Sequence, residues 1–161
     1  ETGGNINEFT GREIRKEYLV AALPADYRSW PSRSIQQAYL CTEPVVRIRK
    51  EDQQYYLTYK SKGLLEREEY NLPLTKEAFD HLLPKADGIV LTKRRYRIPI
   101  EGTGLTIELD LFSGVYEGLC LAEVEFETKQ EAEEFVPPDW FGRDVTFSGE
   151  YQNSRLALRK Q

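Results

Sequence analysis

The amino-acid sequence predicts a mainly β (α+β) fold, in which about eight antiparallel strands close into a barrel with a few helices outside it. Three observations predict this class. Several runs alternate apolar with charged residues at period two and are rich in β-branched and aromatic residues. Glycines separate the later runs at turn positions. Charged residues of like sign recur in pairs on one face of the runs, which favours an enclosed interior.

The strands are expected where the alternation is clearest. A first candidate runs through residues 13–17, and a shorter stretch around Arg67 and Glu69 reads the same way. The longest alternating runs are 45–49, 55–60, 92–98, 105–112 and 121–127. Antiparallel connections are expected between them, because the sequence is mainly β with only short helical segments.

Three helices and one isolated turn are predicted. The first follows Thr75 and ends near residue 83. The second begins at the capping-box pattern 128–131 and ends at the prolines 137–138. A third, short helix starts near Asn153, and a further helical turn is expected at 31–36.

The chain is expected to form one domain over residues 11–161, preceded at 1–10 by an expression remnant and a polar lead-in. No apolar run approaches the ~18 residues of a membrane-spanning helix, and no stretch reads as a secretory signal. The net charge of −5 argues against a general nucleic-acid binder. These observations favour a cytoplasmic protein with no nucleic-acid or membrane partner.

The composition limits the kinds of metal site. Two cysteines and one histidine are too few for a structural zinc site. A disulfide between Cys41 and Cys120 and a pair of free thiols remain open alternatives. A metal ion would therefore be held by carboxylate oxygens, which points to a hard cation such as Mg²⁺ or Mn²⁺.

Period two places residues i and i+2 on one face of a strand. On that face the sequence carries seven cations and seven carboxylates. The cations are Arg15, Arg47, Arg49, Lys60, Arg67, Lys93 and Arg95. The carboxylates are Glu13, Glu17, Glu69, Glu108, Asp110, Glu123 and Glu125. An open sheet with one solvated face accounts for any single strand. A closed barrel with the charges inside accounts better for the whole set, because about eight strands enclose room for one small ligand.

The two kinds of charge suit two kinds of ligand. Arginine forks and lysine ammonium groups bind phosphate oxygens. Clustered carboxylates bind Mg²⁺ or Mn²⁺, and such a metal can generate hydroxide and neutralise charge on a phosphoryl group. Equal numbers of the two signs leave the interior neutral. The negative charge of a linear triphosphate and the positive charge of two divalent cations nearly cancel, so binding both would keep the interior near neutral. The empty interior is expected to be a water-filled tunnel.

Seven short motifs occur in a characteristic order, followed by Asp144-Val145-Thr146, Tyr151 and Asn153. The motifs are Gln37-Ala38-Tyr39-Leu40, Val46-Arg47-Ile48-Arg49, Leu57-Thr58-Tyr59-Lys60, Arg67-Glu68-Glu69-Tyr70, Lys93-Arg94-Arg95-Tyr96, Ile107-Glu108-Leu109-Asp110 and Leu121-Ala122-Glu123-Val124-Glu125. With them the chain resembles, from about residue 13 to 156, the CYTH domain of the triphosphate tunnel metalloenzymes. The short bacterial inorganic tripolyphosphatases are the most similar branch.

The resemblance implies an eight-stranded antiparallel triphosphate tunnel that binds one or two divalent cations. It implies hydrolysis of inorganic triphosphate to diphosphate and phosphate, with Mg²⁺ or Mn²⁺ as cofactor. Two alternatives stay open, a tripolyphosphate- or polyphosphate-binding module with little catalysis and an organic triphosphatase or adenylate cyclase of the same family. A homodimer is also left open.

The resemblance and the charge pattern together give the expected roles of the site residues. Phosphate binding is expected of Arg15, Arg47, Arg49, Lys60, Arg67, Lys93 and Arg95. Metal binding is expected of Glu13, Glu108, Asp110, Glu123 and Glu125, and catalysis of Glu13, Glu17, Asp110, Glu123 and Glu125. Glu69 is expected to complete the wall of the tunnel beside Arg67.

The first strand departs from the family signature, which is Glu-x-Glu-x-Lys followed by an aromatic residue and Leu-Val. When the chain is aligned on Tyr18-Leu19-Val20, Glu13 matches, Arg15 stands at the second Glu and Glu17 stands at the Lys. A β-bulge beyond Ile14 would restore part of the usual placement. A regular strand would instead place an arginine beside the metal position, which would weaken metal binding and lower the activity.

Overall fold

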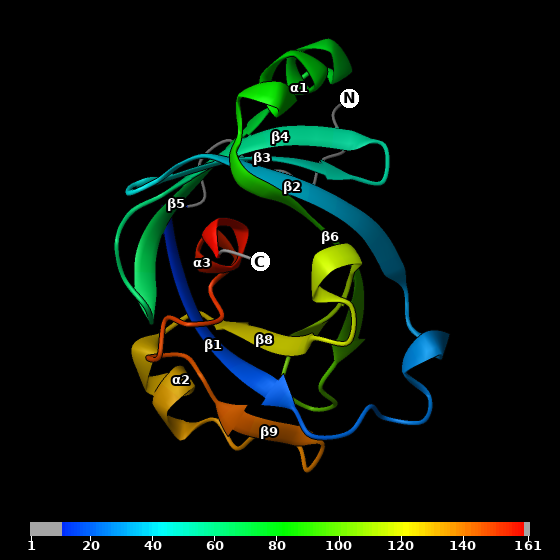
Figure 1. Cartoon of the computed structure of the whole chain (residues 1–161). Helices are drawn as coiled ribbons and strands as arrows, with labels where there is room; N and C mark the ends of the chain where they lie inside the picture. Colours follow the sequence, from blue (N-terminus) through cyan, green and yellow to red (C-terminus); the bar gives the residue numbers. More distant parts are fainter. Residues whose placement is uncertain (1–10, 160–161) are drawn as a thin grey trace.

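Eight antiparallel strands form a closed ring in the computed structural model, which describes residues 11–159 (Figure 1). They are β1 (Gly11–Val20), β2 (Ser32–Thr42), β3 (Val45–Glu51), β4 (Gln54–Lys60), β5 (Glu66–Pro73), β6 (Asp87–Pro99), β7 (Thr106–Ser113) and β8 (Cys120–Phe126). Their order is β5-β4-β3-β2-β6-β7-β8-β1, and β1 pairs back to β5. This confirms the predicted closed antiparallel barrel.

Strand β1 has three partners. Its first four residues pair with β5, and from Ile14 to Leu19 it pairs with β8. The short strand β9 (Phe141–Asp144) pairs with the last part of β1, at Tyr18 and Val20. The ring therefore closes at the first half of β1, and β9 takes the place of β5 along the second half.

The strands carry charged side chains inward and apolar side chains outward. On β3, Arg47 and Arg49 line the interior, whereas Ile48 between them is fully buried outside the ring against Phe79. Successive residues of a strand face opposite sides, so each strand divides its sequence between the interior and the outer core. The apolar face is then covered by helices, as a barrel with a charged interior requires.

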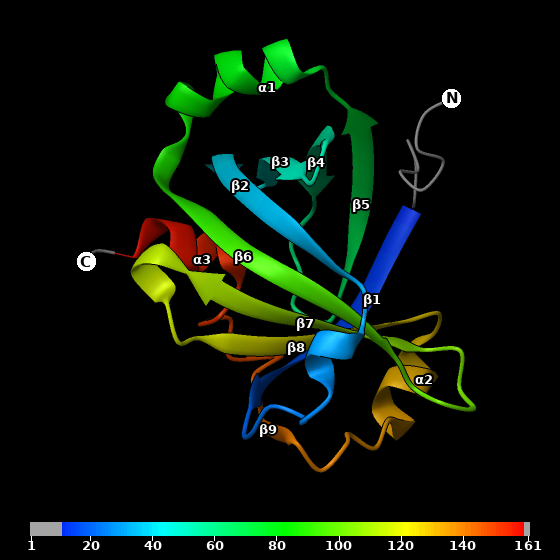
Figure 2. The ribbon, with the colours of Figure 1, turned by 90° about the vertical axis from the view of Figure 1, so that its right-hand side faces the viewer.

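Helix α1 (Lys76–Leu82) covers β2, β3 and β4 from outside (Figure 2). Thr75 caps it, because its Oγ1 accepts a hydrogen bond of 3.0 Å from the backbone N–H of Ala78. Phe79 packs against Ala38 and Ile48. The helix predicted after Thr75 is confirmed, and a 3₁₀ turn, η2 (Leu83–Lys85), continues it.

Helix α2 (Lys129–Glu134) begins with the predicted capping box. The N–H of Glu131 donates to Thr128 Oγ1 at 3.1 Å, and Glu131 Oε1 accepts from the N–H of Glu127 at 3.0 Å. The helix ends at Glu134, before the prolines that were expected to end it. Its buried residue Ala132 belongs to the apolar cluster on the outer face of β1, β7 and β8.

Helix α3 (Asn153–Leu158) lies across one end of the ring (Figure 1). Leu156 and Ala157 pack in an apolar cluster with Tyr39 and Leu91. The hydroxyl of Tyr116, which ends the 3₁₀ turn η3 (Gly114–Tyr116), donates to the carbonyl of Leu156 at 2.6 Å. These contacts fix the predicted third helix at the end of the tunnel.

The helical turn expected at 31–36 is wrong. Residues 32–36 belong to β2, and the local turn is the 3₁₀ segment η1 (Tyr27–Ser29). Strand β2 has neighbours on both sides, since Gln36 pairs with Lys50 of β3 and with Thr92 of β6. Two ladders of backbone hydrogen bonds stabilise the strand more than one local turn would stabilise a helix. The local sequence does not reveal these ladders, because the paired residues are far apart in the chain.

The expected lead-in, residues 1–10, lies outside the described residues. Cys41 and Cys120 are free thiols, which resolves the two alternatives left by the sequence. Within residues 11–159, no helix has both the length and the apolar character needed to cross a membrane.

Candidate active site

The interior of the ring holds a cavity of about 290 Å³ lined by side chains from all eight strands and by residues 152–154. Of the fourteen charged residues assigned to the inner face, all but Asp110 line this cavity. The prediction that the charges face an enclosed space is therefore confirmed by their positions. Most of these side chains are buried in the protein, yet they surround a space large enough for water and a small anion.

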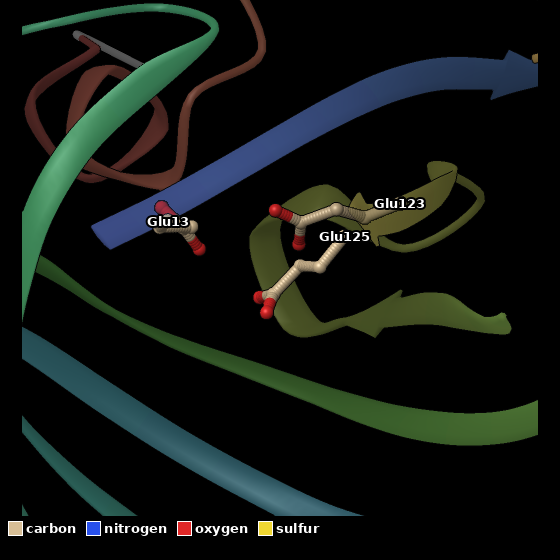
Figure 3. Close-up of side chains that lie close together, drawn as sticks. All are labelled: Glu13, Glu123 and Glu125. Carbon is tan, nitrogen blue, oxygen red and sulfur yellow. The ribbon is translucent and has the colours of Figure 1, made fainter. Parts of the chain in front are cut away.

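Three carboxylates gather at one side of the cavity and form what we call the carboxylate triad, Glu13, Glu123 and Glu125 (Figure 3). One oxygen of each lies within 4.8 Å of the others, and among the described residues they are the group able to share one ion. Glu13 comes from β1, and the other two reach from neighbouring β8. Oxygen donors at this spacing suit a hard cation such as Mg²⁺ or Mn²⁺.

Glu125 is the member of the triad whose main charged neighbours are other carboxylates. Its side chain is exposed to the open space of the cavity, inside the barrel wall. Burial raises the pKa of Glu125 well above the usual value, and the nearby charges of Glu13, Glu108 and Glu123 raise it further. A cation bound at the triad would relieve this repulsion, so the donor set fits a divalent ion.

Glu13 is the member of the triad that already has cationic partners. Lys60 Nζ lies 3.2 Å from Glu13 Oε2, and Arg67 Nε donates to Glu13 Oε1 at 2.7 Å. Burial alone would raise the pKa of Glu13, but the charges of Lys60, Arg67 and Arg15 outweigh it and hold the pKa well below the usual value. Glu13 is therefore ionised, with β4 and β5 supplying its counter-charges.

Arg15 lies beside the triad because β1 is regular there. Residues Ile14 to Leu19 pair one for one with Phe126 to Leu121, so no bulge follows Ile14, and the alternative of a restored register is wrong. Arg15 Nε lies 3.4 Å from Glu123 Oε2, and its Nη1 lies 3.6 Å from Glu17 Oε1. The change in residue order on the first strand is thus a change in the chemistry of the site.

Glu17 follows on the same face of β1. Burial raises the pKa of Glu17 to about 7, against the opposing charge of Arg15 and with support from Glu123. Its backbone N–H donates to Thr146 Oγ1 at 2.9 Å, which ties this part of β1 to the loop after β9. Glu17 lies beside the triad without belonging to it.

Two arginines of β3 form part of the basic wall. Arg47 Nη2 donates to Thr58 Oγ1 at 3.2 Å, and Arg47 Nε has no hydrogen-bond partner among the described residues. Burial lowers the pKa of Arg47, and the charge of Arg49 lowers it further. Arg49 donates through Nε and Nη2 to Gln37 Oε1 at 3.0 and 2.7 Å. Such crowded buried cations suit an anionic ligand.

Asp110 is held in the wall instead of joining the triad. Arg95 donates to it through Nε and Nη2 at 2.7 and 2.8 Å, and Lys93 Nζ lies 2.7 Å away. The pairing of β6 with β7 sets Asp110 directly opposite Arg95. Glu108 lines the cavity but is paired with Arg95 at 3.1 Å and Arg97 at 2.6 Å. The structure therefore separates these two carboxylates from the other expected metal ligands.

Several residues that line the cavity were not predicted from the sequence. Glu51 and Arg97 continue the alternation of Arg47 and Arg49 and of Lys93 and Arg95, and both line the cavity. Arg97 lies inside the run 92–98, and Glu51 lies two residues beyond the run 45–49, so the same alternation identifies both. Asn153 accepts hydrogen bonds from Gln37 and Lys93 at 2.6 and 2.7 Å, and so joins α3 to the basic wall. No local pattern shows this last contact, because it joins residues far apart in the chain.

The comparisons with known proteins agree with this geometry. The CYTH domain family matches residues 33–156. An inorganic triphosphatase of Nitrosomonas europaea is 38% identical over 152 residues, which cover 91% of this chain and 97% of that protein. An inorganic triphosphatase of Acetivibrio thermocellus is 36% identical over 154 residues, covering 91% and 93%.

A solved structure shares the fold. A crystal structure of an inorganic triphosphatase, 34% identical in sequence, matches with a TM-score of 0.69 over 92% of this chain and 95% of that chain. The family match spans most of the residues that build the ring, and the two sequence relatives extend over nearly all of the chain. The chain belongs to the CYTH domain family.

Proposed function

We propose that this protein hydrolyses inorganic triphosphate to diphosphate and phosphate with the help of a divalent cation. One observation carries the proposal, namely the closed ring that places the carboxylate triad across an enclosed cavity from the buried cations of β3 and β6. Phosphoryl transfer depends mainly on positioning and on electrostatic stabilisation, and this cavity offers both. The inorganic triphosphatases among the relatives support the choice of substrate.

The side chains divide the work between the two sides of the cavity. Arg47, Arg49 and Lys93 would bind phosphate oxygens on the basic side, where their charges are crowded. The triad would hold the cation against the other end of the triphosphate. A bound divalent cation would offset charge on the terminal phosphoryl group and lower the pKa of a bound water.

The remaining assigned residues would support these groups. Asp110 would orient Lys93 and Arg95, which it binds directly, and Glu108 would hold Arg95 and Arg97. Lys60 and Arg67 would fix Glu13. We therefore favour positioning roles for Asp110 and Glu108 over the metal-ligand roles expected from the sequence, and we keep Glu17 as a candidate for proton transfer.

The oxygen donors favour Mg²⁺ or Mn²⁺ as the ion. We also propose that the protein works in the cytoplasm without a nucleic-acid or membrane partner, supported by its acidic net charge and its free thiols. The homodimer left open by the sequence stays a prediction.

The test is phosphate release from tripolyphosphate in the presence of Mg²⁺, measured beside release from ATP and thiamine triphosphate. We expect tripolyphosphate to be preferred. Glu123→Gln should lower the rate by at least about a hundredfold, because it removes a charged donor from the triad. Glu133→Gln, an identical change on the exposed face of α2, should leave the rate unchanged. Equal rates on all three substrates would contradict an inorganic substrate.

A second candidate is a triphosphate-binding module with little turnover, and the place of Arg15 beside Glu123 favours it. Tight binding of tripolyphosphate without phosphate release would support this function. The double variant Arg15→Glu with Glu17→Lys restores the family order on β1, and it should then raise the activity. No gain would contradict our interpretation of the first strand.

A further inference from the structure

We propose that the guanidinium of Arg15 takes the place of a second divalent cation, so that this site holds one metal ion and Arg15 itself binds the triphosphate. The inference rests on the proposed function and adds the number of ions and the part played by a residue that departs from the family signature. It concerns the side of the carboxylate triad that faces Glu17.

The position of Arg15 supports the proposal. Its side chain is 3% exposed and lies on the inner face of β1 between Glu13 and Glu17. It pairs with Glu123, a member of the triad, at 3.4 Å and with Glu17 at 3.6 Å. A fixed positive charge therefore already stands between two carboxylates that could otherwise share an ion. A divalent cation placed there would meet strong repulsion, because opposite and like charges interact more strongly inside a protein than in water.

The charges around the triad leave room for one divalent ion. Glu13 is balanced by Lys60 and Arg67, and Arg15 lies against Glu17 and Glu123. Glu125 has no cationic partner within ion-pair distance among the described residues, and four other carboxylates lie near it. One ion at the triad would offset this unbalanced charge, and Arg15 already supplies positive charge beside Glu17 and Glu123, where a second ion would otherwise bind.

Two donors of Arg15 make ion pairs but no hydrogen bond. Nε and Nη1 are buried and lie 3.4 Å from Glu123 and 3.6 Å from Glu17, and neither has a hydrogen-bond partner in the described part of the chain. Buried donors without partners are costly, and a guanidinium offers five of them in a planar fork. Phosphate oxygens match that fork. Arg15 is thus equipped to bind a phosphoryl oxygen beside the ion held by the triad.

The experiment counts ions directly. Mn²⁺ is titrated into metal-free protein saturated with an imido analogue of tripolyphosphate that cannot be hydrolysed, and bound Mn²⁺ is counted by electron paramagnetic resonance. We expect one Mn²⁺ per chain in the wild type and a magnetically coupled pair in Arg15→Glu. Arg12→Glu is the matched control, because Arg12 lies on the same strand with a side chain that is 61% exposed, and it should bind one.

A second measurement needs no metal. In the presence of EDTA, calorimetry should show that Arg15→Gln binds tripolyphosphate at least about tenfold more weakly than the wild type, whereas Arg12→Gln binds equally well. This neutral variant also serves if Arg15→Glu does not fold, which circular dichroism would show. Two Mn²⁺ in the wild type, one in folded Arg15→Glu, or unchanged affinity in Arg15→Gln would each overturn the proposal.

The outcomes also separate this inference from the proposed function. A wild type that releases phosphate from tripolyphosphate but binds two Mn²⁺ keeps the function and overturns the role of Arg15. A wild type with one Mn²⁺ and no phosphate release supports the role of Arg15 and contradicts the hydrolase. A wild type that binds no Mn²⁺ contradicts both the ion count and the triad as its site.

Discussion

Buried ion pairs within and between the strands hold the wall of the cavity together. Asp110 is 5% exposed and serves two cations at once, Lys93 and Arg95. Taking charges out of water costs free energy that only close pairing offsets. Removing one partner of such a group therefore costs more than removing one partner of a surface pair.

We expect Asp110→Asn to lower the free energy of unfolding by about 3–5 kcal/mol, because it removes the carboxylate that pairs with buried Lys93 and that makes the two shortest contacts of Arg95. Urea unfolding monitored by tryptophan fluorescence measures the change. Asp80→Asn is the matched control, since Asp80 pairs with Lys76 at 2.7 Å on the exposed surface of α1. It should hardly move the urea midpoint. Equal shifts in the two variants would contradict a structural role for Asp110.

The sequence predicted which residues face inward, but it did not predict their partners. Alternation along one strand suffices to place Arg47 and Arg49 on one face. The pairing of Asp110 with Arg95 depends on the register between β6 and β7, which one strand cannot reveal. The sequence pattern therefore groups Asp110 with the carboxylates expected to bind metal, whereas its side chain pairs with Lys93 and Arg95.

At the scale of the element, local signals located the helices well. Thr75 and Thr128 were both recognised as helix starts, and both accept the backbone hydrogen bond that defines a cap. These signals lie within four residues, so a single sequence contains them. The helical turn predicted at 31–36 is wrong for the opposite reason. Residues 32–36 belong to β2, and the pairing of β2 with residues outside this segment, on β3 and β6, decides their conformation.

Thr128→Ala should lower the free energy of unfolding by about 1 kcal/mol, since it removes the acceptor for the N–H of Glu131. Thr128→Ser keeps a hydroxyl and should recover most of the loss. Neither variant should change the KM for tripolyphosphate, because α2 packs on the outer face of the ring. Thermal unfolding and steady-state kinetics test the two halves of this prediction, and an altered KM would argue against the separation of cap and cavity.

At the scale of the whole molecule, ring closure collects buried charges that would be solvated in an open sheet. One consequence is a dependence of stability on pH. Glu17 has a pKa of about 7 in the folded protein and 4.5 as its ordinary value. Between these two values the folded chain binds more protons than the unfolded chain, so stability falls as pH rises. The contribution is complete below pH 4.5 and is lost above about pH 7.

Metal-free protein should therefore lose up to about 3 kcal/mol of unfolding free energy between pH 4.5 and 7.5 through Glu17. Urea titrations at several pH values in EDTA would measure it. Glu17→Gln should reduce this slope, to which Glu125 also contributes because its pKa is raised too, whereas Glu133→Gln on exposed α2 should keep the wild-type slope. An unchanged slope in Glu17→Gln would show that Glu17 is ionised throughout this range.

The strict alternation along β8 makes this strand sensitive to insertions and deletions. Glu123 and Glu125 line the cavity, while Ala122, Val124 and Phe126 pack in the outer apolar cluster. Deleting one codon within this strand would exchange the two sets, sending ligands into the core and hydrocarbon into the tunnel. A point change alters one side chain of one set, whereas an insertion or deletion within the strand would disturb the core and the cavity together.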